Sequence, residues 1–407
     1  MSLDQIFATR ASRMKASEIR ELLKLLDQPG IISFAGGIPD PALFPADEFA
    51  EAFAAALEPS HQAQALQYSV SEGYLPLRQW IVDQMAGIGI ACGVENVLIT
   101  SGSQQALDYL GKLFLSSGDT ALVGWPTYLG ALAAFNAYEP RYDQLSINGN
   151  RPAADYADAA AISGQVKFAY LSADFANPTG ETVDLRGREA LLDLAEELDC
   201  AVIEDAAYQA LRYDGEAVPP ILSLEIARKG SIEACRTVYC GSFSKTLSPG
   251  LRVGWVVAAQ PVIAQMVLLK QAADLHSSTI NQMAIARVAE RCFDIHIPKL
   301  RAVYQRRRDT MLAALSRYMP EGVQWTRPEG GMFVWLTLPP GMDGGALLEH
   351  SLDTVRVAFV PGQAFFADGS GANTLRLSFS CTDEAVIEDG IRRLGELLRS
   401  QQPERVC

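Results

Sequence analysis

Short apolar runs alternate with longer segments of helical periodicity in the middle of the chain. The apolar runs favour buried strands, and they lie at 97–100, 121–123, 168–171 and 201–203. The segment 185–198 carries leucines on one helical face and would return the chain to the sheet. Because strand, helix and strand recur from about residue 97 to residue 259, we expect a mostly parallel, doubly wound sheet that binds its ligand at the carboxyl ends of the strands.

Both ends of the chain also contain helical patterns. Apolar positions 19, 22, 23 and 26 share one face of a helix that Pro29 and Gly30 would end. Pro298 is expected to begin a long, charged helix through Arg308. The last predicted helix has an apolar face made of Ile387, Ile391, Leu394 and Leu398.

Composition excludes several classes of protein. The chain has 407 residues and is 49% hydrophobic, which is enough for two or three domains. Its formal net charge of −14 argues against nucleic acid and anionic membranes as partners. Seven scattered cysteines without a C-x-x-C pair argue against a disulfide framework or a zinc site, so we expect no metal. Without a long apolar stretch or a signal peptide, we expect a cytoplasmic protein.

One lysine lies between two hydroxyl residues and two short apolar strands. It is Lys245, and Arg252 follows seven residues later in the run G-S-F-S-K-T-L-S-P-G-L-R-V-G-W (241–255). Because both flanks are apolar, we expect Lys245 to project into a site. Ser242, Ser244 and Arg252 could all face one anion, for which a guanidinium fork is well suited. A lysine beside a phosphate cradle suggests a Schiff base to a phosphorylated aldehyde.

Two further strand ends carry candidate groups. After the strand 97–100, the residues Gly102, Ser103 and Gln104 open a helix, whose unpaired N–H groups suit a phosphate. The same pattern alone could be a plain helix cap. Asp205 follows a fully apolar strand, where an ionised carboxylate needs a cationic partner. Its alternative role is to cap the next segment.

Together these motifs are similar to those of a known enzyme family. The run 242–255 resembles the lysine motif of pyridoxal-phosphate aminotransferases of the aspartate-aminotransferase fold, fold type I and class I/II, and the resemblance covers about residues 16–398. It implies pyridoxal 5′-phosphate as the cofactor. It also implies an α/β fold, with a mostly parallel, doubly wound sheet of the seven-stranded type in a large domain and a smaller α+β domain. The expected divisions are an arm (1–30), a substrate-side part of the small domain (31–60), the large cofactor-binding domain (61–295) and the rest of the small domain (296–407).

The resemblance also implies roles around the cofactor ring. Lys245 would be the catalytic residue and would bind the cofactor as a Schiff base. Asp205 would pair with the pyridine nitrogen, while Asn177 and Tyr208 would hold the phenolic oxygen. Tyr128 would stack on the ring. Without the resemblance, Asn177 would belong to a turn and Tyr128 would pack on the next helix.

The phosphate would be bound by two elements of one chain and by the neighbouring subunit. The two elements consist of Gly102, Ser103, Gln104, Ser242, Ser244 and Arg252. Tyr68, in a Y-x-x-x-x-G-x-x-x-L-R signature, would reach the phosphate of the other subunit. The resemblance therefore implies a homodimer with shared active sites. The alternative for Tyr68 is a half-buried core tyrosine.

The substrate would be recognised by residues outside the central sheet. Arg376 lies in the alternating strand 373–380, where an arginine either faces solvent or clamps a carboxylate. The family pattern N-x-x-R-L-x-F implies the clamp, with Asn177 beside it. Gly37, in an F-x-x-G-x-P stretch, would line the substrate pocket. Arg20 resembles the arginine that recognises a distal carboxylate in aminoadipate enzymes, and a solvated helix charge is the equal alternative.

The implied activity is a ping-pong amino-group transfer. The stretches S-E-I-R-E-L-L-K and F-A-G-G-I-P are similar to the branch that contains 2-aminoadipate and kynurenine aminotransferases. The donor would be 2-aminoadipate, an aromatic or a branched or aliphatic L-amino acid, and 2-oxoglutarate the expected acceptor. A β-lyase or decarboxylase could use the same cofactor site. A non-enzymatic amino-acid sensor is disfavoured by the net charge and by the short leader before residue 17.

Overall fold

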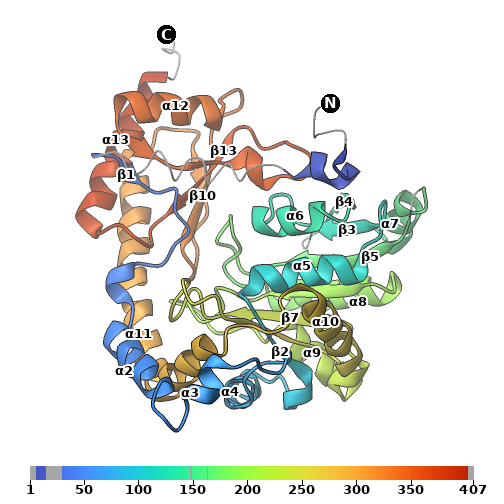
Figure 1. Cartoon of the computed structure of the whole chain (residues 1–407). Helices are drawn as coiled ribbons and strands as arrows, with labels where there is room; N and C mark the ends of the chain where they lie inside the picture. Colours follow the sequence, from blue (N-terminus) through green and yellow to red (C-terminus); the bar gives the residue numbers. More distant parts are fainter. Residues whose placement is uncertain (1–5, 15–29, 147–148, 163, 402–407) are drawn as a thin grey trace.

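A seven-stranded sheet forms the centre of the larger part of the molecule (Figure 1). The computed structural model describes residues 6–14, 30–146, 149–162 and 164–401. The strands are β2 (Val97–Thr100), β3 (Thr120–Val123), β4 (Arg141–Gln144), β5 (Val166–Leu171), β6 (Ala201–Asp205), β7 (Thr237–Ser242) and β8 (Gly254–Val257). Their order is β2-β8-β7-β6-β5-β3-β4, with β8 antiparallel to both neighbours and the other pairs parallel. The predicted mostly parallel sheet is confirmed.

Helices cover both faces of this sheet. On one face lie α5 (Ser103–Phe114), α6 (Leu129–Asn136) and α10 (Gln260–Ala273), which share a buried cluster with Ile203. The other face is covered by α4 (Leu75–Gly87), α7 (Ala153–Ala160), α8 (Leu185–Glu197) and α9 (Ile221–Lys229). Val202 joins the cluster under α8, because successive residues of a strand point to opposite faces. The sheet is therefore buried on both sides, and ligands can reach it only at the strand ends.

One helix of 40 residues, α11 (Thr279–Tyr318), links the large sheet to the carboxyl-terminal part. The prediction that a helix begins at Pro298 is wrong, because Pro298 lies inside α11. Buried side chains lie on both sides of the proline, among them Ile285 and Tyr304. Packing of this continuous face outweighs the backbone hydrogen bond that a proline cannot make. Residue 295, where we predicted the large domain to end, also lies within this helix.

The carboxyl-terminal part contains a second, smaller sheet. Its four strands have the order β12-β13-β10-β9, and they are β9 (Gln324–Trp325), β10 (Phe333–Thr337), β12 (Val360–Pro361) and β13 (Thr374–Ser378). Apolar side chains of this sheet pack against α11 and α13 (Glu384–Gln401). The helix α12 (Gly344–Thr354) lies beside them. The predicted last helix is thus confirmed, with Ile387, Ile391, Leu394 and Leu398 buried.

The amino-terminal segment is part of this smaller unit. The strand β1 (Ile32–Ser33) pairs in parallel with β11 (Val357–Ala358). It leads to α2 (Ala46–Ala56) and α3 (Gln62–Leu66). The helix predicted from positions 19 to 26 lies outside the described residues. Short 3-10 helices occupy Thr9–Arg13, Pro41–Leu43, Val94–Asn96, Ile232–Ala234 and Gly362–Phe365. Among the helices that the structure describes, none has the length and apolar character needed to cross a membrane.

Candidate active site

The carboxyl ends of β2, β5, β6 and β7 bring residues from four parts of the chain to one edge of the sheet. Gly102 follows β2, Asn177 follows β5, Asp205 ends β6, and Lys245 follows β7. Strands that run in the same direction end at the same edge, where doubly wound sheets bind ligands. Lys245 interacts electrostatically with Asp205 and with Arg376 of the small sheet, so these side chains face one space.

Lys245 is held by the backbone of the amino-terminal segment. Its Nζ atom donates a hydrogen bond of 2.8 Å to the carbonyl oxygen of Gly37 and lies 5.7 Å from the ring centroid of Tyr208. Burial, and then the guanidinium groups of Arg376 and Arg252, lower the pKa of Lys245 from 10.5 to about 8. A lysine with this pKa is partly neutral near physiological pH. The neutral amine is the form that attacks an aldehyde or accepts a proton.

Asp205 is a buried carboxylate without a cationic side chain against it. It is 4% exposed, and none of the described residues forms an ion pair with it. Oδ2 accepts a hydrogen bond of 2.8 Å from the hydroxyl group of Tyr170. Burial raises the pKa of Asp205, while the bond from Tyr170 and the charge of Lys245 lower it. A cationic ligand atom here would complete the pairing that an ionised buried carboxylate requires.

Arg376 is a buried guanidinium with a free hydrogen-bond donor. It is 1% exposed, so the alternative of a solvent-facing arginine is excluded. Nη1 donates to Oδ1 of Asn177 at 2.7 Å, and Nη2 donates to the carbonyl oxygen of Ala35 at 2.9 Å. Nε is buried and has no partner among the described residues. The guanidinium also lies 4.3 Å from the ring centroid of Phe333. This geometry fixes the guanidinium and leaves its Nε group as a donor for an anion.

Two loops form a cup at the amino end of α5. Gly102 has φ +79°, and a Cβ atom built on it would lie 2.8 Å from Cζ of Arg252. Arg252, whose φ is +54°, donates through Nη2 to the carbonyl oxygen of Ser101 at 3.5 Å. The amide of Ser244 donates to Oγ of Ser242 at 3.1 Å. The cup therefore combines a helix amino terminus, hydroxyl groups and a guanidinium, which suits a phosphate dianion.

The remaining phosphate candidates differ in orientation. Ser103 is the first residue of α5 and lies at the cup. Gln104 instead turns its side chain toward α6, where Nε2 donates to the carbonyl oxygen of Gly130 at 2.7 Å. Its backbone amide remains near the first turn of the helix. Gln104 can thus reach a phosphate through the backbone rather than through its side chain.

Tyr128 and Tyr208 lie close to Asn177. Tyr208 is 6% exposed and packs edge-on against Phe333, with ring centroids 5.5 Å apart. Burial and the nearby Tyr128 raise the pKa of Tyr208, whereas its hydrogen bond with Asn177 opposes that effect. Tyr128 directly precedes α6. The two rings and the amide thus surround the space between Lys245 and Asn177.

Three predicted residues come from the amino-terminal part of the chain, and the structure describes two of them, Gly37 and Tyr68. Gly37 contributes its carbonyl oxygen to Lys245, and a Cβ atom on it would lie 2.9 Å from Cζ of Phe333 and 3.8 Å from Nη2 of Arg376. Tyr68 is 79% exposed, so the alternative of a core tyrosine is excluded. Its ring lies 6.0 Å from that of His276. Arg20 lies outside the described residues.

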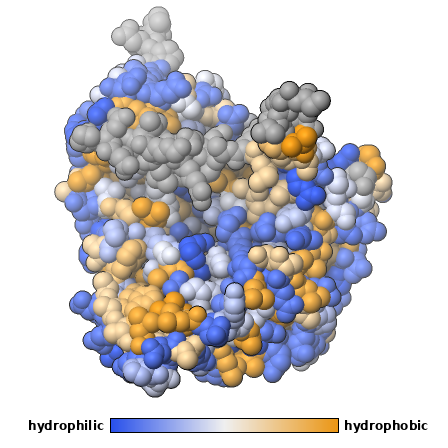
Figure 2. Space-filling view, in the orientation of Figure 1, coloured by the Kyte–Doolittle hydropathy of each residue, from blue (hydrophilic) through white to orange (hydrophobic). Residues whose placement is uncertain are grey.

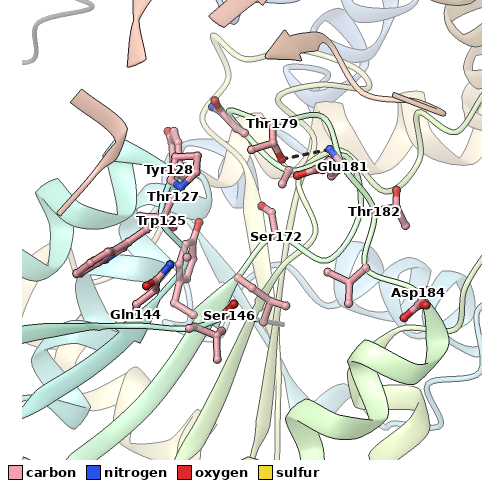
Figure 3. A pocket seen from close by; sticks show the side chains of 18 residues that line it. Trp125, Thr127, Tyr128, Gln144, Ser146, Ser172, Thr179, Glu181, Thr182 and Asp184 are labelled. Carbon is pink, nitrogen blue, oxygen red and sulfur yellow. Dashed lines mark hydrogen bonds between the residues drawn. The ribbon is translucent and has the colours of Figure 1, made fainter. Parts of the chain in front are cut away.

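A cavity of 390 Å³ opens beside Tyr128 and Asn177 (Figure 3). It lies at the carboxyl ends of β3, β4 and β5, and its polar wall includes Glu181 and Asp184. In the loop that follows Asn177, the amide of Glu181 donates to Oγ1 of Thr179 at 3.3 Å. No Lys, Arg or His residue contributes to the described lining. This cavity can receive a side chain, but it offers no cation to a distal carboxylate.

Several residues at the site were not predicted. Tyr170 lies inside an apolar run that predicted only a buried strand, so no sequence signal marks its bond to Asp205. Phe333 and the carbonyl of Ala35 support Arg376 from segments far away in the chain. Within the described ranges, no group of three or more His, Cys, Asp or Glu residues could hold a metal ion.

Comparisons with known proteins identify relatives that cover almost the whole chain. Residues 39–394 match the family model described as "Aminotransferase class I and II". The 2-aminoadipate transaminase of Thermus thermophilus is 44% identical, with 98% of each protein covered. The aromatic-amino-acid aminotransferase 1 of Thermococcus litoralis is 41% identical, with 98% of this chain and 96% of the relative covered.

Solved structures give the same picture. The α-aminoadipate aminotransferase of Thermus thermophilus, complexed with N-(5′-phosphopyridoxyl)-L-leucine, has a TM-score of 0.87 and 42% identity, with 98% of this chain and 99% of that chain covered. The kynurenine aminotransferase of Pyrococcus horikoshii, in complex with PMP, has a TM-score of 0.91 and 40% identity, with 99% of both chains covered. The predicted fold type is thereby confirmed.

Proposed function

Because this chain belongs to the class I and II aminotransferases, we propose that it transfers the amino group of an L-amino acid to a 2-oxo acid with Lys245 as the catalytic residue. Pyridoxal phosphate is the cofactor. The observation that carries the assignment of roles is the unpaired Nε of the buried Arg376, which lies beside Asn177 and near Lys245. A buried guanidinium that lacks an anion is suited to the α-carboxylate of an amino acid.

The residues present fit the cofactor at three points. The cup at Gly102, Ser244 and Arg252 suits its phosphate. Asp205 is a buried carboxylate that lacks a cationic partner, as a protonated ring nitrogen would be. Tyr208 and Asn177 would donate to its phenolic oxygen. We propose this set, with Tyr128 against the ring, as the cofactor site.

When bound, pyridoxal phosphate supplies an electron-poor ring that accepts the electron pair released as a bond to the substrate α-carbon breaks. Arg376 would bind the substrate α-carboxylate, and Asn177 holds Arg376 in place through the 2.7 Å bond. Asp205 would keep positive charge on the ring nitrogen. Lys245 Nζ, once free and neutral, would take the proton from the substrate α-carbon and deliver it to the C4′ atom of the cofactor. Proton transfer by one amine requires no other base in the site.

We propose that the donor is 2-aminoadipate or an aromatic or aliphatic amino acid, as the names of the relatives suggest. The side chain would enter the cavity beside Tyr128 and Asn177. Since its lining contains Glu181 and Asp184 but no described cation, a distal carboxylate would need a cation from elsewhere, and Arg20 is our candidate. If Arg20 has this role, Arg20→Ala raises KM for 2-aminoadipate by about tenfold and leaves KM for leucine unchanged.

We also propose that the enzyme is a homodimer with shared active sites, located in the cytoplasm. Exposed apolar residues lie near Tyr68, and Figure 2 shows apolar surface in the region of α2 and α3. Those residues are Leu57, Leu66, Val70 and Leu75. Burying them against a second copy would remove an unfavourable surface and bring Tyr68 to the phosphate of the other subunit. Sedimentation equilibrium tests this, with twice the mass of one chain expected and a monomer contradicting it.

The absorbance of the holoenzyme tests the reaction. We would add 2-aminoadipate, glutamate, kynurenine, leucine and methionine in turn and follow the yellow colour of the bound cofactor. A donor should bleach it and 2-oxoglutarate should restore it, whereas Lys245→Ala should show neither change within the same time. L-Cysteine is tested in the same way, and if it gives ammonia, hydrogen sulfide and pyruvate without any 2-oxo acid added, the enzyme is a β-lyase instead.

A further inference from the structure

A second cavity, of 530 Å³, lies behind the loop that carries Lys245. Its walls come from α4, from α11, from the segment after β6 and from the ends of β7 and β8. Ser242 contributes to this lining, whereas Lys245, Asn177 and Arg376 do not. The volume falls within the range of sites for small organic ligands, about 300 to 1,000 Å³. The cavity is therefore large enough for a ligand of its own, apart from the substrate.

Small residues of the segment after Asp205 form part of the cavity wall. Ala206, Ala207 and Ala210 line the cavity, and Gly215 and Ala217 continue the same wall. Longer side chains of the same segment, Gln209, Arg212 and Tyr213, line the cavity beside these small residues. The opposite wall is bulky and apolar, and it includes Trp80, Met85, Ile88 and Phe293. A flat or branched apolar group would pack against these bulky side chains, and the small residues of the other segment leave room for it.

Arg301 adds a positive charge to the wall of this cavity. Its Nε donates to the carbonyl oxygen of Ala210 at 2.7 Å, and among the described residues its two terminal nitrogens have no acceptor. Gln209 uses Oε1 to accept from the hydroxyl group of Tyr239 at 2.7 Å, so its amide nitrogen is also free among those residues. Both Arg301 and Gln209 line the cavity. Two kinds of donor thus lie at one wall without a partner.

The other charges of the cavity are already paired. Asp174 accepts from Arg188 at 2.8 Å and from Arg212 at 3.1 Å. Arg212 also pairs with Glu329 at 2.9 Å. None of the described carboxylates pairs with Arg301. Burial and, to a smaller extent, the nearby Arg212 lower the pKa of its guanidinium group. An anion at Arg301 would remove this imbalance.

We propose that this cavity binds a small monocarboxylate with an aromatic or branched apolar body, distinct from the substrate site. The carboxylate would accept hydrogen bonds from Arg301 and Gln209, and the apolar body would lie against Trp80, Met85 and Phe293. This binding does not depend on the reaction that the enzyme catalyses. It would place a ligand directly behind Ser242, at the end of β7, and Thr246, which follows the catalytic lysine.

Titration calorimetry of the holoenzyme with 3-phenylpropionate tests the proposal. Because a carboxylate can also bind Arg376, the measurement is made on Arg376→Lys, in which we expect one bound ligand per chain. Adding Arg301→Met should weaken this binding by about tenfold or more. The matched control is Arg306→Met, a change on the same helix at an exposed side chain that pairs with Glu384. The neutral 3-phenylpropanamide should bind at least about tenfold more weakly than the acid.

Ala210→Phe provides an independent test that leaves the charge intact. A phenyl group at residue 210 would occupy the cavity and should abolish binding. This variant therefore tests the proposal even where Arg301→Met gives no folded protein. The proposal is overturned if Arg376→Lys binds no 3-phenylpropionate up to millimolar concentration. It is equally overturned if binding is unchanged by both Arg301→Met and Ala210→Phe, since the ligand would then lie elsewhere.

Discussion

The hydroxyl group of Tyr170 donates a hydrogen bond of 2.8 Å to Oδ2 of Asp205, and both side chains are buried. The two residues come from the adjacent parallel strands β5 and β6. The ring of Tyr170 is fixed by an edge-on contact with Phe135, with centroids 5.6 Å apart. A rigid donor of this kind stabilises the ionised form of a carboxylate that burial would otherwise neutralise. Tyr170 is therefore a positioning residue for Asp205.

Tyr170→Phe should move the acid limb of the pH profile upward. Burial raises the pKa of Asp205, and the bond from Tyr170 lowers it, so removing the hydroxyl group raises that pKa further. Asp205 is then protonated, and activity lost, at a higher pH than in the wild type. The measurement is kcat/KM against pH. Tyr239→Phe is the control, because that buried hydroxyl group bonds Gln209 instead. Identical acid limbs in the two variants would contradict the role of Tyr170.

Lys245→Met should stabilise the cofactor-free protein at neutral pH. The pKa of Lys245 is about 8 in the folded chain against an ordinary 10.5, so the unfolded chain binds more protons between these values. Wild-type stability thus rises with pH across this window, whereas the variant lacks this contribution. The melting temperature of Lys245→Met should exceed that of the wild type at pH 7, and the gap should narrow from pH 8 to pH 10. An equal gap at all pH values would refute this, and Lys112→Met, an exposed change, should show almost none.

Asp40→Asn should destabilise the smaller unit more than an exposed ion pair does. Asp40 pairs with Arg307 at 2.7 Å, with side chains 12% and 10% exposed. Asparagine keeps the acceptor for the amide of Ala42 but leaves Arg307 as a buried, unpaired cation. We expect a loss of about 3 kcal/mol in the free energy of urea unfolding. Glu384→Gln, which breaks the exposed pair with Arg306, should cost less than about 1 kcal/mol. Similar losses of unfolding free energy in the two variants would show that the buried Asp40 pair stabilises the protein no more than an exposed pair does.

Gly102→Ala should weaken cofactor binding specifically. Gly102 and Gly230 have φ of +79° and +81°, so either substitution introduces similar backbone strain. At Gly102 the new Cβ atom would overlap the guanidinium of Arg252, whereas at Gly230 nothing lies within 4 Å. We expect Gly102→Ala to raise the Kd for pyridoxal phosphate by about tenfold, through displacement of Arg252. The Kd is measured by absorbance titration of the cofactor-free protein, and an unchanged value relative to Gly230→Ala would count against the phosphate cup.

Much of the large sheet could be predicted because its signals are local. Apolar runs ended by glycine, and charged residues just past those runs, identify strand ends within a few residues, as at Asp205 and Lys245. The family resemblance then predicted that the residues at these strand ends belong to one cofactor site. The roles of these residues stay predictions, because geometry alone does not test chemistry.

The supporting contacts could not be predicted in the same way. The bond between Lys245 and Gly37 joins residues 208 apart, and the pair of Arg307 and Asp40 joins residues 267 apart. Such contacts depend on tertiary packing, which no local pattern encodes. Pro298 illustrates the opposite error, since a strong local signal for a helix start yields to the packing of α11. The cavity behind Lys245 is lined by residues from several distant segments, so no single residue signals it.

The pairing of β1 with β11 has a consequence for synthesis of the chain on the ribosome. Ala35, next to β1, and Arg376 are 341 residues apart, so Ala35 emerges long before its partner exists. At about 5 to 20 residues per second, the delay is on the order of 20 to 70 s. During that time the central sheet can form, while the amino-terminal segment has no strand to join. A nascent chain released before β11 would contain a cofactor domain whose β1 segment has no strand to pair with, and would be a target for chaperones and proteases.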